Sequence, residues 1–225
     1  MLSFLLLVFL CVVIMFTLTK IRALNEDENL FGKIIYIDAG HGGKDNGASV
    51  ENVLEDNINL NISKLLAEKL IDAGAYVLMS RTSDYDLASL YDKNRKRTDL
   101  LKRVNYINNS KPDIFISIHL NTYSSPLISG PQVFYQDNED SKQIAEIMQK
   151  KLNDLSNRNR NSKYGDFYIL NNTKCPGILI ECGFLSNLEE RNKLNNSNYQ
   201  EKLSDNIKKS LNEYFMNKRW CESDW

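Results

Sequence analysis

The chain has only two histidines, and each follows an apolar segment with the composition of a buried strand. His41 lies in the sequence DAGHGG after the segment KIIYI, and His119 directly follows the segment DIFISI. In an open α/β sheet, the carboxyl ends of parallel strands meet at one rim, where loops converge and ligands bind. A single histidine in a turn is more often a hydrogen-bonded core or surface residue. Two imidazoles at one rim instead indicate a metal site.

An acidic residue is the expected third ligand, because catalytic zinc commonly has three protein ligands and an open fourth position for water. Glu55 opens the first long helix after the glycine loop and is well placed, while Glu51 and Asp56 are nearby rivals. Acidic residues are also enriched in the first turn of helices because they complement the helix dipole. These residues by themselves therefore leave the choice of third ligand open.

A second carboxylate, Glu181, ends the apolar segment GILIE. Charged residues are rarely buried for packing alone, so this position indicates a chemical role. Cys182 follows it and has the surroundings of a small buried hydrophobe rather than a nucleophile. The 4 cysteines of the chain lack the C-x-x-C pairing of a structural zinc site, and we assign no cysteine a chemical role.

Other common catalytic and nucleotide-binding motifs are absent. The glycines around His41 do not form G-x-G-x-x-G, because Asp45 occupies the last glycine position, and no G-x-x-x-x-G-K-[ST] occurs. The zinc protease motif H-E-x-x-H and the serine hydrolase motif G-x-S-x-G are missing as well. Nucleotide binding is therefore disfavoured, and a non-hydrolytic metal protein stays open as an alternative.

Short apolar segments alternate with longer segments of helical period from residue 32 onward, which is the pattern of α/β architecture. We expect a single open, mostly parallel twisted sheet with helices on both faces, preceded by an N-terminal apolar helix. The expected strands cover residues 33–38, 75–79, 113–118, 132–135, 167–170 and 177–181. The expected helices cover residues 56–73, 93–108, 141–155 and 199–215, and Gly74 should cap the first of them.

The composition is that of a folded domain without a nucleic-acid partner. Hydrophobic residues make up 42% of the chain and charged residues 25%, which is typical of a globular protein. The chain has 28 basic and 29 acidic residues, so its net charge is close to zero. Such a charge gives no electrostatic attraction for nucleic acid or anionic lipid. We divide the chain into a signal peptide or membrane anchor (1–23), a short linker (24–31), a catalytic domain (32–216) and an unassigned tail (217–225).

The N-terminal segment is uncharged and mostly apolar over residues 2–18, near the lower length limit of a membrane-spanning helix. No small-residue cleavage signal follows it, so a retained membrane anchor is favoured over a cleaved signal peptide. Lys20 and Arg22 come directly after the apolar run. By the positive-inside rule alone, these two charges would weakly retain the domain in the cytoplasm.

Several of these segments together resemble the zinc-dependent N-acetylmuramoyl-L-alanine amidase family. They are IYIDAGHGGKDNGAS (35–49), LEDNINL (54–60), SRT (80–82), RVNYIN (103–108), FISIHLN (115–121) and ILIECGFLSN (178–187). The segments follow the order of the family and span nearly all of the chain after the N-terminal segment. Within the family, the short leader, the single domain and the sequence SGPQVFY are most similar to the sporulation- and germination-specific amidases.

The resemblance implies that His41, Glu55 and His119 are zinc ligands and that Glu181 is the catalytic carboxylate. It implies hydrolysis of the amide between N-acetylmuramic acid and L-alanine in peptidoglycan. For the sporulation subgroup it implies a role in forming the muramic δ-lactam of the spore cortex, and so in germination. Because peptidoglycan lies outside the membrane, the enzyme should be extracytoplasmic, either anchored or secreted, against the weak indication of the flanking charges.

Arg81 and Arg103 also match family positions, where fold-supporting ion pairs are at least as good an explanation as substrate contact. Two other functions are alternatives, namely a catalytically silent wall-binding or regulatory module and a zinc peptidase that cleaves another amide. An accessory lipoprotein is a candidate partner. Weak zinc retention by the isolated chain would indicate that such a partner completes the site.

Overall fold

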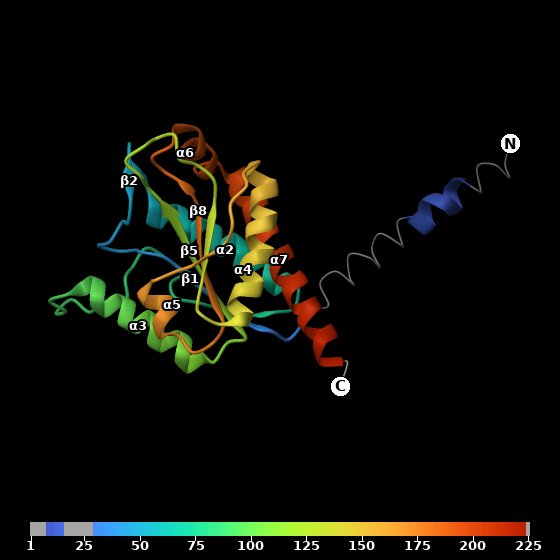
Figure 1. Cartoon of the computed structure of the whole chain (residues 1–225), viewed down its shortest axis with the longest axis horizontal. Helices are drawn as coiled ribbons and strands as arrows, with labels where there is room; N and C mark the ends of the chain where they lie inside the picture. Colours follow the sequence, from blue (N-terminus) through green and yellow to red (C-terminus); the bar gives the residue numbers. More distant parts are fainter. Residues whose placement is uncertain (1–7, 16–28, 224–225) are drawn as a thin grey trace.

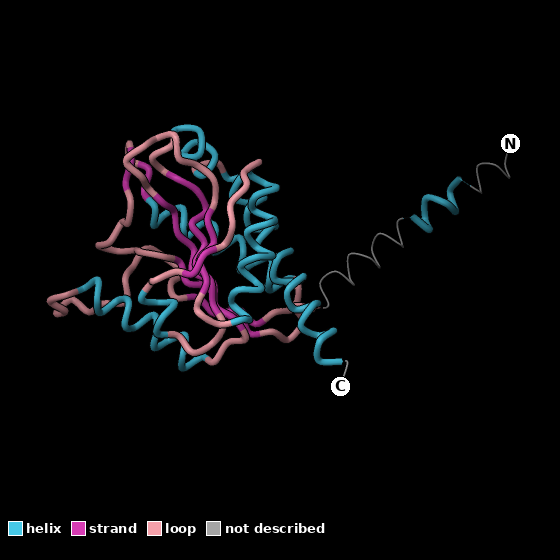
Figure 2. The backbone as a smooth tube through the Cα atoms, in the orientation of Figure 1, coloured by secondary structure: helices cyan, strands magenta, loops and turns pink. Residues whose placement is uncertain are grey.

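The computed structural model describes residues 8–15 and 29–223, and a six-stranded sheet lies at the centre of the domain (Figure 1, Figure 2). The strand order is β4-β1-β5-β8-β6-β7. The strands are β1 (Ile34–Ala39), β4 (Tyr76–Met79), β5 (Ile114–Asn121), β6 (Gln132–Tyr135), β7 (Lys163–Tyr164) and β8 (Gly177–Phe184). Strands β4, β1, β5 and β8 are parallel to one another, whereas β6 is antiparallel to β8 and β7 is parallel to β6. The predicted open, mostly parallel sheet is therefore confirmed.

Helices cover both faces of this sheet, as the sequence predicts (Figure 1). One face packs against α2 (Glu55–Asp72), α4 (Glu139–Ser156) and α7 (Ser197–Ser223), and the other packs against α3 (Arg95–Ser110) and α5 (Tyr168–Asn172). Successive side chains of a strand point to opposite faces. Accordingly, Ile35 and Ile37 of β1 lie in the larger core, while Tyr36 lies in the smaller one.

The central strands are buried on both faces, as expected for parallel strands covered by helices. All residues of β8 are buried, including Cys182, which is 1% exposed and is the small buried hydrophobe that its sequence context predicts. Strand β4 lies at the edge of the sheet, where Tyr76 is 69% exposed. The site described below therefore rests on strands that neither solvent nor an open sheet edge disturbs.

The start of α2 is tied to the loop that precedes it. Its N-terminal flanking residue, Leu54, makes no capping hydrogen bond through its side chain. Instead, the first two amides of the helix donate to main-chain carbonyls of the glycine loop, Glu55 to Ala48 at 2.9 Å and Asp56 to Asn46 at 3.3 Å. At the other end, Gly74 has a φ of 83° and terminates the helix as predicted.

The strand predicted over residues 167–170 is wrong, because Phe167 flanks helix α5 and the next three residues belong to that helix rather than to the sheet. A short apolar run cannot be assigned to helix or strand from its periodicity alone. In the structure, Ile169 and Leu170 pack on the sheet face that carries Phe115. The hydroxyl of Thr173 donates to the Ile169 carbonyl at 2.9 Å, which closes the helical turn.

Several short elements were not predicted from the sequence. They are a two-stranded hairpin formed by β2 (Ser49–Val50) and β3 (Val53–Leu54), the short strand β7, and helix α6 (Leu188–Leu194). In addition, α7 continues to Ser223 beyond the expected end at residue 215, so much of the unassigned tail is helical.

The N-terminal segment is described only over residues 8–15, which are helical and solvent-exposed. The remaining parts of the predicted leader and linker, residues 1–7 and 16–28, lie outside the described residues. Within the part of the chain that the structure describes, no helix combines the length and the apolar character needed to cross a membrane.

Candidate metal centre

Neighbouring strands bring His41 and His119 to one rim of the sheet. Ala39, the last residue of β1, pairs with Ile118 of β5, and His119 is the next residue of β5. His41 follows two residues after Ala39 with a φ of 61°, a left-handed conformation that is uncommon for residues other than glycine. The two rings meet edge to face with their centroids 4.9 Å apart. The predicted meeting of the two histidines is confirmed.

Glu55, the first residue of α2, lies between the two imidazoles. Its Oε1 atom is 3.2 Å from His41 Nε2 and 3.0 Å from His119 Nδ1. One ligand atom from each of the three residues lies within 4.8 Å of the others, so they form a group that could hold a metal ion. The structure thus assembles the three residues that the sequence singled out.

The two rival carboxylates are not part of this group. The side chain of Glu51 is 74% exposed and forms an ion pair with Arg191 at 2.7 Å. Asp56 is buried, and its main-chain carbonyl accepts a hydrogen bond from Arg81 at 2.7 Å. Of the three acidic candidates, the structure places Glu55 alone beside both histidines.

Hydrogen bonds fix the Glu55 carboxylate in place. The Ala48 amide donates to Oε2 at 2.8 Å, and the Leu120 amide and the Asn59 side chain donate to Oε1 at 3.0 and 3.3 Å. Burial alone would raise the pKa of Glu55, but hydrogen bonds with His119 and His41 outweigh it and hold that pKa well below its usual range. Glu55 is therefore an ionised, preoriented oxygen ligand.

Two glycines make room for the ligands. A Cβ atom added to Gly40 would lie 2.3 Å from His119 Cε1, and one added to Gly47 would lie 2.5 Å from Glu55 Oε2. Gly47 also has a φ of 65°, a conformation that residues with a side chain rarely adopt. These contacts explain why glycine residues surround the first histidine.

Glu181 lies on β8 directly opposite His119 in the register of β5 and β8. It is 9% exposed, and its Oε2 atom is buried without a hydrogen-bond partner. Burial raises the pKa of Glu181 to about 7, with the nearby Glu55 charge adding to this effect and the histidines opposing it. A carboxyl group that titrates near neutral pH can accept a proton and return it.

Asp45 belongs to the site although it was not predicted as part of it. Its Oδ2 atom is 2.9 Å from His41 Nδ1, on the opposite side of the ring from Glu55. Burial lowers the pKa of His41, but the hydrogen bonds to Glu55 and Asp45 raise it to about 9. A carboxylate that holds the second nitrogen of a histidine ligand fixes its orientation. The only sequence signal was an acidic residue four positions after His41.

The two arginines are fully buried, each 1% exposed, so neither is available to contact substrate. Arg103 forms the ion pairs expected of a fold-supporting residue, with Asp38 at 2.6 Å and Asp99 at 2.7 Å. Arg81 forms no ion pair with any residue in the described ranges, and all of its hydrogen bonds go to main-chain carbonyls.

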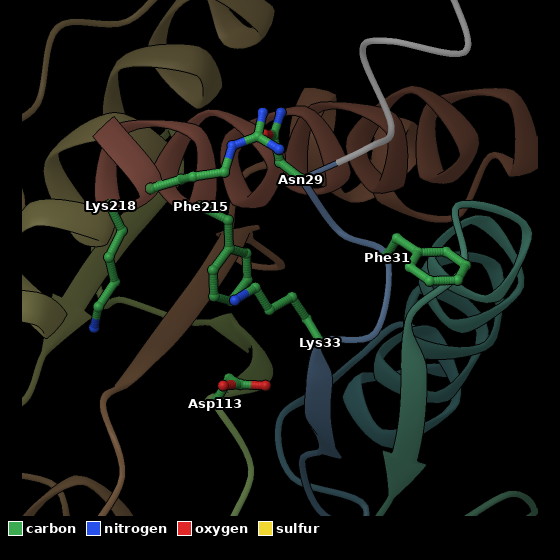
Figure 3. A pocket seen from close by; sticks show the side chains of 7 residues that line it. Asn29, Phe31, Lys33, Asp113, Phe215 and Lys218 are labelled. Carbon is green, nitrogen blue, oxygen red and sulfur yellow. The ribbon is translucent and has the colours of Figure 1, made fainter. Parts of the chain in front are cut away.

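A separate cavity of about 530 Å³ lies at the other end of the same strands (Figure 3). It is lined by Asn29, Phe31, Lys33, Asp113, Phe215, Lys218 and Arg219. These residues precede or begin β1 and β5 or lie on the last turns of α7, and none of the candidate metal ligands reaches it. This cavity is therefore not the chemical site.

Fold and site together define an α/β protein with a candidate centre for one metal ion, of the type that metal-dependent hydrolases use. Residues 35–213 match the N-acetylmuramoyl-L-alanine amidase family, and the chain belongs to that family. The resemblance noted in the sequence is thereby confirmed.

Three similar proteins illustrate this membership. The germination-specific N-acetylmuramoyl-L-alanine amidase of Bacillus subtilis is 40% identical over 195 residues, which cover 84% of this chain and 82% of the relative. The CwlD amidase from Clostridioides difficile, solved in complex with the GerS lipoprotein, is 35% identical with a TM-score of 0.78, over 81% of this chain and 98% of that one. An N-acetylmuramoyl-L-alanine amidase from Clostridium difficile 630 is 32% identical with a TM-score of 0.73, over 81% and 96% of the two chains.

Proposed function

We propose that this chain is a zinc-dependent amidase that cleaves the bond between N-acetylmuramic acid and L-alanine in peptidoglycan. The observation that carries the proposal is the meeting of His41, Glu55 and His119 within 4.8 Å, with Glu181 on the neighbouring strand. Membership in the amidase family supplies the substrate class.

The donor set suits zinc. Two imidazoles and one carboxylate form a common set of protein ligands for catalytic zinc, which leaves a fourth position for water. The Glu55 carboxylate is ionised, and Asp45 orients His41 from its far side. The buried Glu181 Oε2 atom, which has no hydrogen-bond partner, is the acceptor that a water molecule in this site would need. We therefore assign His41, Glu55 and His119 as the ligands.

In the proposed reaction, His41, Glu55 and His119 hold the metal ion, and Glu181 transfers the proton. When bound, zinc supplies Lewis acidity that polarises the lactyl carbonyl and lowers the pKa of a water molecule. Glu181 accepts a proton from the attacking water as the new C–O bond forms, and it returns that proton to the nitrogen of L-alanine as the C–N bond breaks. The products are the lactyl carboxylate of muramic acid and a free amino group on the stem peptide.

The biological setting is a further part of the proposal. The name of the Bacillus subtilis relative, germination-specific amidase, supports a role in maturation of the spore cortex. Peptidoglycan lies outside the membrane, which favours an extracytoplasmic location with the apolar N-terminal segment as signal peptide or anchor. The complex of CwlD with a lipoprotein makes an accessory lipoprotein a reasonable partner for this chain as well.

Zinc analysis combined with product identification tests the proposal. The full chain should contain zinc and release free L-alanine amino termini from purified peptidoglycan without new reducing ends. Glu181→Gln should retain zinc, yet its kcat should fall by roughly 10²- to 10⁴-fold because the general base is lost. Cleavage at another amide would identify a peptidase. Full activity of Glu181→Gln would remove Glu181 from the mechanism, and absence of both zinc and product would favour the silent module.

A further inference from the structure

Three consecutive main-chain carbonyls turn away from the sheet where β1 ends, and buried arginines donate to all of them. Arg103 donates to the carbonyls of Ala39 and His41 at 2.7 and 2.6 Å. Arg81 donates to the carbonyls of Ala39 and Gly40 at 3.0 and 2.9 Å. The Gly40 carbonyl also accepts from the Asn59 side chain at 3.3 Å, whereas the carbonyls of Ala39 and His41 would lose their side-chain donors without the arginines, which is costly. The turn that carries His41 is therefore held by guanidinium groups.

Arg81 differs from Arg103 because none of its contacts within the described residues is an ion pair. It is 1% exposed, and within the described part of the chain no carboxylate lies at ion-pair distance from it. Burial and the nearby charge of Arg103 lower the pKa of Arg81, and the charges of Asp56, Asp38 and Asp84 oppose this effect without forming an ion pair. Main-chain carbonyls alone satisfy its donors, so support of the backbone is the role that the contacts indicate.

Two of the carbonyls that Arg81 contacts belong to different segments that carry candidate metal ligands. Its Nη2 atom donates both to the Gly40 carbonyl at 2.9 Å and to the Asp56 carbonyl at 2.7 Å. Gly40 directly precedes His41, and Asp56 directly follows Glu55. A single nitrogen thus connects the backbone beside one candidate ligand to the backbone beside another.

We propose that Arg81 is a positioning residue for the metal centre and sets the separation between His41 and Glu55. The inference rests on the zinc site proposed above and extends it to a residue that touches neither metal nor substrate. Metal–ligand distances tolerate deviations of only ~0.2 Å. Loss of an outer partner of a zinc ligand typically weakens metal binding by about 10- to 100-fold.

Arg81→Lys tests this role, with Arg191→Lys as the matched control. Lysine keeps the positive charge, but its compact ammonium group cannot span carbonyls on two elements. Arg191 is also buried and donates to a main-chain carbonyl, that of Leu185, but it contacts no residue next to a candidate ligand. In competition titrations of the metal-free full chain against a chromophoric chelator, we expect zinc affinity to fall about 10- to 100-fold in Arg81→Lys. Arg191→Lys should bind zinc as the wild type does.

The outcomes separate this inference from the proposed function. If the wild-type chain binds no zinc, the metal centre itself is refuted. If the wild type binds zinc and Arg81→Lys binds it equally well, the positioning role alone is refuted. Should Arg81→Lys fail to fold, the wild-type chain still provides a test, because coupling between two sites is reciprocal. Zinc should then slow solvent exchange of the Arg81 Nε proton in NMR spectra, and an unchanged exchange rate would overturn the inference.

Discussion

Gly40→Ala is expected to abolish tight zinc binding while leaving the fold intact. The added Cβ atom would lie 2.3 Å from His119 Cε1 and 2.4 Å from His119 Nε2. Ordinary van der Waals contact begins at 3.4 Å, so the ring and the backbone must separate by 3.4 − 2.3 = 1.1 Å. That displacement is several times larger than the ~0.2 Å that metal–ligand distances tolerate. His119 would then no longer meet the other two ligands in the required geometry.

The magnitude follows from this displacement. Loss of a residue that only orients a zinc ligand typically lowers metal affinity by about 10- to 100-fold, and here the ligand itself is displaced. We therefore expect zinc affinity to fall by about 100-fold in Gly40→Ala, with a comparable loss of amidase activity at limiting zinc. The metal-free fold should tolerate the change, because Gly40 is not among the glycines that have a positive φ.

Chelator competition on the metal-free chain measures the affinity, and thermal unfolding in the absence of zinc measures the fold. Gly32→Ala is a suitable control, because Gly32 has a φ of 73° but a Cβ added to it would contact nothing within 4 Å. The control should therefore lose about 1 kcal/mol of stability from backbone strain and keep its zinc affinity. If Gly40→Ala bound zinc as tightly as the wild type does, the reasoning would be refuted. That result would mean that the His119 ring avoids the added Cβ atom without losing its position as a ligand.

Two further predictions concern the carboxylates of Asp45 and Asp38, of which only Asp38 is buried. Asp45→Asn should weaken zinc binding about 10- to 100-fold, because the amide orients the His41 ring less firmly than the carboxylate does, and chelator competition would show it. Burial alone would raise the pKa of Asp38, but Arg103 and Ser117 hold it below its usual range. The stabilisation from this pair is therefore complete above about pH 4 and is lost as the pH falls through the lowered pKa. In urea unfolding, Asp38→Asn should cost ~3–5 kcal/mol at pH 7, and a gap to wild type that stayed constant down to pH 3 would contradict this.

The meeting of the two histidines could be predicted from the sequence because the ends of parallel strands have a simple geometry. His41 and His119 follow apolar segments whose composition predicts buried strands, and the carboxyl ends of parallel strands share one rim. The choice of Glu55 over Glu51 did not follow from spacing alone. It came from the family resemblance, and in the structure Glu51 pairs with Arg191 while Glu55 lies beside both histidines.

Other features depend on tertiary contacts that spacing does not encode. The contact of Asp45 with His41 requires the particular turn of the glycine loop, in which the amide of Gly42 donates to the carbonyl of Asp45 at 2.9 Å. The four carbonyls around Arg81 come from three segments of the chain, at Ala39 and Gly40, at Asp56 and at Ser83. Residues 167–170 are apolar enough for a strand, and only their packing against the sheet face distinguishes them as part of a helix.

The register between β5 and β8 has a consequence for how folding of the enzyme can be measured. His119 faces Glu181 across these two strands, with Ile118 facing Ile180 one position earlier. Because side chains alternate between the two faces of a sheet, a slip of one residue would turn Glu181 toward the opposite face and leave an aliphatic or thiol side chain beside His119. A misaligned sheet would thus be inert even if it were compact. The hydrolytic activity of a sample therefore reports the fraction of molecules in which these strands are correctly aligned. Refolding of this chain can be followed by its specific activity rather than by its secondary-structure content.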